Sequence, residues 1–218
     1  MALTGYYPVS LLVRNKPCVI VGGGTVAQRK AQTLLRYGAK VIVISPQVRP
    51  GLARLVRRGQ VRHLRRAFRA DDLRGAWLVY GCTDDHAVNA AVFRAAQRHR
   101  VLANIVDVPE HCTFIATSQV KRGGLVFSIT TSGGSPALAK RVRKEVEQVF
   151  GPEYGRFLGL LNRLRPQVMR RVATPAARKR VFTRLVHRDD ILELLKRGRT
   201  QQARTRAERL IAQAGNHR

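Results

Sequence analysis

A chain of 218 residues is long enough for one large domain, or for a domain with an appendage, around a buried core. Its 41 Lys and Arg residues against 13 Asp and Glu give a formal charge of +28, which attracts polyanions such as nucleic acid, an anionic membrane or a substrate with many carboxylates. The alternative is a solvated basic surface without a partner, because the arginines are spread along the chain and not gathered in one run.

Residues 19–38 predict a strand, a glycine turn and a helix closed by Gly38. Within them, Gly22, Gly24 and Ala27 fit the G-x-G-x-x-G/A fingerprint of a dinucleotide-binding fold. Gly22 permits the sharp turn, Gly24 lets the backbone approach a pyrophosphate, and Ala27 lets the helix pack close to the strand. A plain glycine turn is the alternative, but the strand before it and the helix after it favour a dinucleotide. The residues expected to contact the cofactor are Gly22, Gly23, Gly24, Thr25, Val26 and Ala27.

The second predicted strand, at 41–44, is not followed by the acidic residue that commonly holds the ribose hydroxyls of NAD. The chain has Ser45, Pro46 and Gln47 at that place and no Asp or Glu among its first 70 residues. Either backbone groups and Ser45 hold the ribose, or Arg49 binds the additional phosphate of NADP. The residues of this stretch therefore predict a cofactor contact at 45–47 and leave NAD and NADP both open.

Strands and helices continue to alternate through residue 106 in units of about 30 residues, which predicts a doubly wound parallel α/β sheet of the Rossmann type. The predicted elements are a helix around Leu52–Arg58, a strand near Val61–Leu64, a strand at Trp77–Cys82, a helix from about Asp85 to His99 and a fifth strand at Val101–Val106.

The pattern changes after residue 113. Two strands, at Phe114–Ala116 and Leu125–Thr130, are expected to form a small antiparallel element around a short basic connection. A helix at Ala137–Phe150 follows, with Ser135 as its N-cap, and then helices at roughly 153–164, 176–187, 190–196 and 201–214. The predicted parts are a Rossmann domain at 1–113, an α+β region at 114–150 and a helical part with a basic tail at 151–218.

Polar residues follow the fourth and fifth predicted strands, where ligands collect in a doubly wound sheet. Thr83 is expected to face the nucleoside of the cofactor by its position, whereas Asp84 and Asp85 are better explained as a helix cap and a first-turn acid. Asp107 follows an apolar strand and precedes Val108-Pro109, where a carboxylate can take a proton or hold a metal. Its alternative is an aspartate that caps a turn.

The segment Thr131–Ser135 places glycine N–H groups before a helix, which is either a site for an anion or simply a good cap with a flexible entry. No pair of histidines has zinc-ligand spacing, so no permanent metal site is expected. Cys18, Cys82 and Cys112 are odd in number and far apart, which excludes a disulfide framework. With neither a signal-peptide pattern nor an apolar run of the ~20 residues that a span needs, a reducing cytoplasm and no membrane are expected.

Five ordered segments together resemble the precorrin-2 dehydrogenase and sirohydrochlorin ferrochelatase family, which comprises the N-terminal module of siroheme synthases and its stand-alone relatives. The resemblance covers about residues 6–150 and is far more specific than a glycine fingerprint. Its segments are YYPVSLLVRNKPCVIVGGGTVAQRKAQTLL, VIVISP, WLVYGCTDDHAVN, NIVDVPEHCTF and ITTSGGSPALAKRVRKEVE.

The resemblance implies oxidation of precorrin-2 to sirohydrochlorin with NAD⁺ as the hydride acceptor, and in some members insertion of Fe²⁺ to give siroheme. It implies a Rossmann domain, a homodimer joined near 114–150 and a helical C-terminal part. Family members use NAD although their second strand ends without an acidic residue. Carried over to this sequence, Gly22–Ala27 and Pro46-Gln47 contact the cofactor and Asp107 is the catalytic acid–base. Some members bear a phosphorylatable serine where Thr131 or Ser132 stands.

The residues fit this assignment, because precorrin-2 carries eight carboxylates and suits a basic cleft. The expected substrate-binding residues are Thr131, Ser132, Gly133, Gly134 and Ser135. Two alternatives are an NAD(P)-binding regulatory module that binds nucleic acid through its C-terminal arginines, and an NADP-dependent reductase of another substrate. The first lacks a helix-turn-helix or an aromatic-interleaved signature. The Arg-rich stretch after about residue 170 matches the family poorly.

Overall fold

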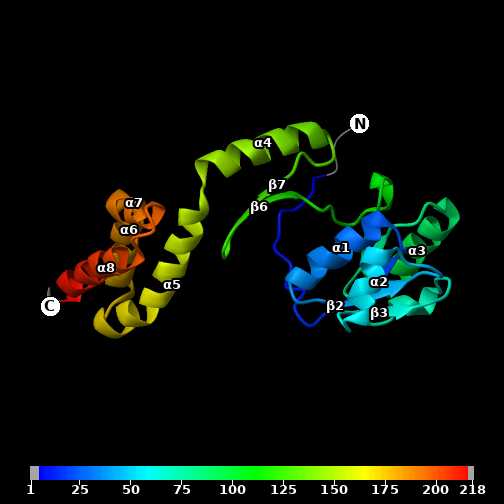
Figure 1. Ribbon diagram of the computed structural model, residues 1–218, viewed down its shortest axis with the longest axis horizontal. Helices are drawn as coiled ribbons and strands as arrows, with labels where there is room; N and C mark the ends of the chain where they lie inside the picture. Colours follow the sequence, from blue (N-terminus) through cyan, green and yellow to red (C-terminus); the bar gives the residue numbers. More distant parts are fainter. Residues whose placement is uncertain (1–4, 216–218) are drawn as a thin grey trace. The chain divides into compact units, whose positions relative to one another are not determined.

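The computed structural model describes residues 5–215, and the chain divides after Ala116 into two compact units. The first unit holds a five-stranded sheet flanked by helices, and the second holds a two-stranded sheet and five helices (Figure 1). None of the described helices is both long and apolar enough to cross a membrane.

All five strands of the first unit run parallel in the order β3-β2-β1-β4-β5. This strand order has its switch point beside β1, as in a Rossmann fold, and it confirms the predicted doubly wound sheet. The elements are β1 (Pro17–Val21), α1 (Thr25–Arg36), β2 (Lys40–Ile44), α2 (Pro50–Arg57), β3 (Val61–Leu64), the 3-10 turn η1 (Ala70–Leu73), β4 (Leu78–Gly81), α3 (His86–His99), β5 (Leu102–Ile105) and the 3-10 turn η2 (Pro109–His111).

The central strands are apolar on both faces because helices cover both sides of a parallel sheet. On one face, Ile20 and Val43 are buried with α1 and α2 in a single hydrophobic cluster. On the other face, Val19 and Val79 are buried with α3. Since successive strand residues point to opposite faces, the run CVIV of β1 supplies both halves of the core.

The free edge of β5 is covered by the segment that follows η2. Thr113 N–H donates to the Ala103 carbonyl at 2.8 Å, and its Oγ1 accepts from Ala103 N–H at 2.8 Å. The Cys112 thiol donates to the Ile105 carbonyl at 3.2 Å. These hydrogen bonds pair backbone groups at the edge of β5 that would otherwise be left unpaired. The predicted strand at Phe114–Ala116 is wrong, because these residues follow this covering segment and enter no ladder.

In the second unit, the stretch predicted to be a polar connection is itself a strand. β6 (Ser118–Arg122) pairs antiparallel with β7 (Leu125–Ile129) through the two-residue turn Gly123-Gly124, where Gly123 has φ +60°. A glycine at positive φ is what a tight hairpin turn requires. The basic residues of β6 concealed the strand because a small two-stranded sheet leaves alternate side chains in solvent.

Five helices follow the hairpin: α4 (Pro136–Val149), α5 (Pro152–Arg171), α6 (Pro175–Val186), α7 (Asp189–Lys196) and α8 (Thr200–Gly215). The predicted end of α5 at residue 164 is too early, since the helix continues through Pro166. Leu160, Leu164 and Val168 lie on one face of α5 and are buried against the C-terminal helices. The free energy gained from this packing offsets the loss of the backbone hydrogen bond that an internal proline removes.

Candidate functional site

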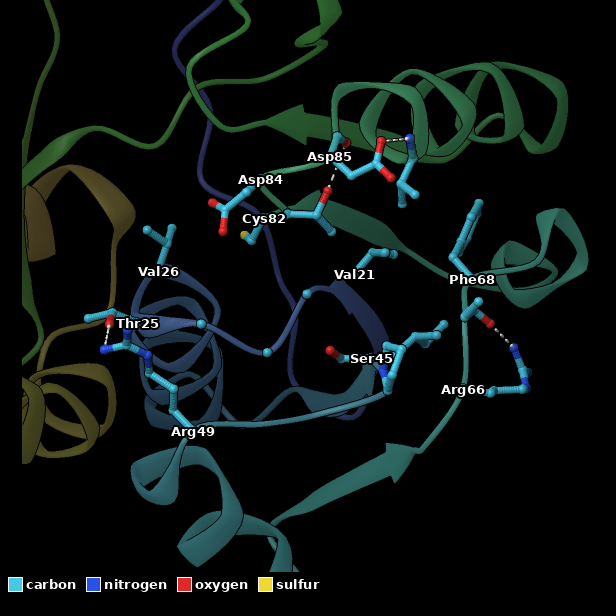
Figure 2. Close-up of a pocket in the computed structure, with 18 residues that line it drawn as sticks. Val21, Thr25, Val26, Ser45, Arg49, Arg66, Phe68, Cys82, Asp84 and Asp85 are labelled. Carbon is cyan, nitrogen blue, oxygen red and sulfur yellow. Dashed lines mark hydrogen bonds between the residues drawn. The ribbon is translucent and has the colours of Figure 1, made fainter.

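A cavity of about 590 Å³ opens at the carboxyl ends of β1, β2, β3 and β4, beside the switch point of the sheet (Figure 2). We call it the glycine-loop cavity. Its lining comprises residues 21–26 of the glycine loop, 44–46 and Arg49 after β2, 66–68 after β3, and 82–85 with Val88 after β4.

The three glycines of the loop are required for different reasons. Gly22 has φ +123°, and a Cβ there would lie 2.4 Å from the Cys82 carbonyl oxygen. A Cβ on Gly23 would lie 1.9 Å from the Gln47 carbonyl oxygen. Gly24, in contrast, has no atom within 4 Å of an ideal Cβ position. The protein itself therefore requires the first two glycines, while the third keeps space open on the cavity side, as a pyrophosphate would need.

The N-terminus of α1 faces this open space without a cap of its own. Gly24 is the N-cap residue, no side chain caps the helix, and its first turn contains no acidic residue. The first backbone hydrogen bond of the helix runs from Gln28 N–H to the Gly24 carbonyl at 3.0 Å. Free N–H groups and the positive end of the helix dipole favour an anion at this place.

The loop after β2 is fastened to the glycine loop. Ser45 Oγ donates to the Gln47 carbonyl at 2.6 Å, and Arg49 N–H donates to the Gly23 carbonyl at 2.9 Å. His63 Nε2 lies 2.9 Å from the Ser45 carbonyl. Gln47 thus supports the loop. It is not among the residues that line the glycine-loop cavity, where a contact with the cofactor is predicted for it.

The cavity brings together most of the residues predicted to bind the cofactor. Two others, Ala27 and Gln47, lie outside the lining, and Ala27 is fully buried at the contact between helix and strand. The predicted residues that do line the cavity are Gly22, Gly23, Gly24, Thr25, Val26, Ser45, Pro46 and Thr83.

Thr83 and its neighbours form the entry to α3. Thr83 Oγ1 lies 2.9 Å from both the Asp85 carbonyl and Asn89 Oδ1, and Asn89 Nδ2 donates to the Thr83 carbonyl at 2.9 Å. Asp85 accepts from the N–H groups of Ala87 and Val88 at 2.8 Å and 3.1 Å. The predicted helix cap is therefore confirmed at Asp85, whereas the predicted first-turn acid is wrong, because α3 begins at His86 and its first turn holds no acidic residue.

Sequence reasoning missed the residues after β3 that line the cavity, of which Arg66 and Phe68 have functional side chains. Arg66 forms a bidentate pair with Asp72, at 2.8 Å and 2.5 Å, and this guanidinium lowers the pKa of the Asp72 carboxyl. Phe68, half-buried, contributes an apolar ring of the kind on which an adenine can stack (Figure 2). Both follow the strand that pairs with β2, and this pairing is the signal that could have identified them.

Asp107 lies in the turn two residues beyond β5, with φ +62° and an exposed side chain. Aspartate is one of the few residues that tolerate the left-handed region. Asp107 belongs to the same edge of the sheet as the cavity, because all five strands are parallel, but it is not among the residues that line it. Its acid–base role stays a prediction.

The loop before α4 belongs to the second unit and is held by its own hydroxyls. Ser135 caps the helix by accepting from Leu138 N–H at 3.2 Å, and Thr131 Oγ1 accepts from Ser135 N–H at 3.0 Å. Ser132 and Gly133 have φ +52° and +87°. The predicted cap is confirmed, while binding of a substrate by Thr131–Ser135 stays a prediction.

The cysteines of the first unit are poor nucleophiles. Burial raises the pKa of Cys18 to about 11 and that of Cys82, which lines the cavity, to about 12, so both are protonated at neutral pH. The Lys30 ammonium lies 4.5 Å from the centre of the Tyr80 ring, and burial lowers its pKa. Within residues 5–215, no three His, Cys, Asp or Glu side chains are placed to hold a metal ion.

Two family models match this chain, one in each of its two compact units. Residues 9–118 match the family model described as "Putative NAD(P)-binding", and residues 153–211 match the model of the sirohaem synthase dimerisation region. The second match runs from the start of α5 into α8. It lies C-terminal to the segment 114–150, for which the sequence predicts the contact between subunits.

Curated relatives with this similarity are siroheme synthases. The siroheme synthase of Methylobacillus flagellatus is 36% identical over 208 residues, which cover 95% of this chain and 44% of the relative. Siroheme synthase 3 of Aeromonas hydrophila is 36% identical over 207 residues, with the same coverage of 95% and 44%. The chain thus spans less than half the length of the relatives that it matches.

A solved structure titled "SirC, precorrin-2 dehydrogenase" has the same fold. Its TM-score to this chain is 0.77 at 24% sequence identity, over 94% of this chain and 100% of that one. The similarity therefore extends over both units and confirms the predicted succession of a Rossmann-type sheet and a helical C-terminal part.

Proposed function

We propose that this chain, which belongs to the NAD(P)-binding family that its residues 9–118 match, is an NAD-dependent precorrin-2 dehydrogenase of siroheme biosynthesis. The observation that carries the proposal is the glycine-loop cavity at the switch point of the sheet. The chain that builds this cavity is similar to a siroheme synthase over 95% of its length. The two alternatives, a module that grips nucleic acid and a reductase of another substrate, find no counterpart among these relatives.

The residues of the cavity fit a dinucleotide. N–H groups at the uncapped start of α1 would hold the pyrophosphate next to Gly24, where the structure leaves space. Ser45 Oγ, whose proton is engaged by the Gln47 carbonyl, would accept from a ribose hydroxyl. Phe68 offers a face to the adenine. When bound, the nicotinamide accepts the hydride that leaves precorrin-2.

Loss of a hydride must be accompanied by loss of a proton, for which Asp107 is the proposed acceptor. Its place beyond the carboxyl end of β5 and its exposed carboxylate support this role. The loop Thr131–Ser135, with Gly133 and Gly134 before the N-terminus of α4, is the proposed contact to the carboxylates of the tetrapyrrole. The formal charge of +28 supports a substrate with many negative charges.

Three further features belong to the proposal. The relatives' name, siroheme synthase, supports insertion of Fe²⁺ as a second activity, with the ion as a substrate. The match to a dimerisation region supports a homodimer, in which the hairpin and α4, at 114–150, or the helices of 153–211 contact the second copy. We place the enzyme in the cytoplasm, where the free thiols of Cys18, Cys82 and Cys112 would stay reduced.

The test is to mix the purified chain with precorrin-2 and either NAD⁺ or NADP⁺ and to follow the absorbance of sirohydrochlorin. The proposal predicts turnover with NAD⁺. A Gly24→Val variant measured in parallel distinguishes the enzymatic reaction in the glycine-loop cavity from oxidation of precorrin-2 by air. The variant should lose the enzymatic rate and keep the rate of oxidation by air. Absence of turnover with both cofactors, or a clear preference for NADP⁺, would overturn the proposal.

A further inference from the structure

A dinucleotide in the glycine-loop cavity would bring a pyrophosphate that carries negative charge on each of its phosphates. Charges that leave bulk water require hydrogen-bond donors or a cation nearby. The free N–H groups at the start of α1 supply donors. The carboxylates of Asp84 and Asp85, which follow β4 and also line the cavity, repel an anion. A cation on the side of α1 would therefore strengthen the binding of the cofactor.

Arg49 is a cation that lies on this side. It lines the cavity, and its Nη1 donates to Thr25 Oγ1 at 3.1 Å (Figure 2). Thr25 is the first residue of α1 and directly follows Gly24, which has no atom within 4 Å of an ideal Cβ position. The guanidinium thus lies at the uncapped start of the helix, where the pyrophosphate is expected.

The backbone of Arg49 is held independently of its side chain. Its N–H donates to the Gly23 carbonyl at 2.9 Å. Pro50 directly after it restricts Arg49 to an extended backbone, and its φ of −64° and ψ of 156° agree with this. A group that is in place before the ligand arrives loses less conformational entropy on binding. A substitution of the side chain should leave the loop itself in place.

The charge of Arg49 is also available to a ligand. The other arginine that lines the cavity, Arg66, is neutralised by its bidentate pair with Asp72. Arg49 takes part in none of the ion pairs found within residues 5–215, and Thr25 Oγ1 is the acceptor found there for its guanidinium. The remaining N–H groups can donate to phosphate oxygens, which the planar guanidinium fits through two parallel hydrogen bonds.

We infer that Arg49 binds the pyrophosphate of the dinucleotide and holds it against the N-terminus of α1. The inference rests on the proposed function, to whose cofactor site it adds a residue. The guanidinium keeps its hydrogen bond to Thr25 Oγ1 and donates its other N–H groups to oxygens of the pyrophosphate. Because the pyrophosphate does not react, Arg49 stabilises the bound cofactor equally before and during hydride transfer. Its loss should therefore lower NAD⁺ affinity and leave kcat nearly unchanged.

The experiment is calorimetric titration of the full chain with NAD⁺ and with ADP-ribose, which carries the same pyrophosphate without the nicotinamide. Arg49→Gln should weaken the binding of both ligands by about 10- to 100-fold, the usual loss for hydrogen bonds to a charged group. Arg49→Lys should recover part of this loss, since it restores the charge without the planar fork. With precorrin-2 as substrate, Arg49→Gln should raise the KM for NAD⁺ and keep kcat within about twofold.

Ionic strength separates a direct contact of charges from a structural role of Arg49. The affinity difference between the unmodified chain and Arg49→Gln should shrink as the salt concentration rises from about 0.05 M to about 1 M, because the Debye length falls to about 3 Å. A displaced glycine loop would instead give a difference that salt does not reduce, together with a lower melting temperature.

Arg57→Gln is the matched control, because it removes the same charge from an exposed position of α2 that does not line the cavity. It should leave affinity, KM and kcat unchanged. Unchanged NAD⁺ affinity in Arg49→Gln, a loss that salt does not reduce, or a fall in kcat without a loss of affinity would overturn the inference alone. If the unmodified chain binds no NAD⁺, the proposed function is overturned with it.

Discussion

Replacing Gly24 by valine tests the cavity most sharply, because the structure separates the effect on folding from the effect on the cofactor. An ideal Cβ at Gly24 has no neighbour within 4 Å, and the backbone there, with φ −80° and ψ −168°, is extended and accessible to any residue. Valine is a poorer N-cap than glycine, which costs less than about 1 kcal/mol, and the stiffer unfolded chain offsets part of this. For a chain of 218 residues, the melting temperature should move by less than about 3 °C.

The cofactor should respond very differently. The valine side chain fills the space at the start of α1 and removes about two hydrogen bonds between N–H groups and a charged phosphate, each worth about 1.5–3 kcal/mol. The sum, about 3–6 kcal/mol, corresponds to a loss of about 10²- to 10⁴-fold in NAD⁺ affinity. Titration calorimetry and thermal melting on one preparation measure both quantities.

Two comparison variants complete this test. Gly5→Val adds the same side chain at another position without neighbours within 4 Å and should change neither quantity. Gly23→Ala should behave in the opposite way, because its Cβ would lie 1.9 Å from the Gln47 carbonyl oxygen, and it should lower the melting temperature strongly. A Gly24→Val protein that keeps its NAD⁺ affinity, or loses it only through unfolding, would refute the reasoning.

Three further outcomes are expected. Asp107→Asn, which keeps a residue tolerant of positive φ, should lower kcat by about 10²- to 10⁴-fold while NAD⁺ affinity and melting temperature barely move; a fully active, stable variant would end the catalytic proposal. Light scattering should show a dimer at micromolar concentration, and a monomer would contradict a subunit contact through 114–150 or 153–211. The guanidinium of Arg66 holds the pKa of Asp72 below its ordinary value of 3.8, so the pair should stabilise the fold modestly above that pH and lose this contribution as the pH falls further. Melting curves of Asp72→Asn against pH should lack this pH-dependent difference.

The sheet and the glycine loop could be predicted because their signals are local. A run of buried β-branched residues, a fingerprint of glycines and a periodic helix lie within about twenty residues of one another. The sharp turn predicted at Gly22 agrees with its φ of +123°, and the open space beside Gly24 leaves the room that its predicted role needs. The reason for Gly23 was missed, since it depends on the carbonyl of Gln47, which only the folded loop after β2 brings near.

Other features depend on contacts that no short window contains. Arg66 and Phe68 enter the cavity because β3 pairs with β2, and the sequence gives no direct sign of this register. β6 was hidden because its polar residues alternate on a sheet of only two strands. α5 extends past Pro166 because tertiary packing of its apolar face outweighs the local preference of proline to end a helix.

The central claim is that this chain transfers a hydride from precorrin-2 to a nicotinamide cofactor bound in the glycine-loop cavity. The most direct measurement is the stoichiometry of an anaerobic reaction with precorrin-2 and NAD⁺, in which NADH and sirohydrochlorin are quantified in the same sample. The account predicts one NADH for each sirohydrochlorin, with both products lost in Gly24→Val. Sirohydrochlorin formed without NADH, or no product from the unmodified chain, would contradict it.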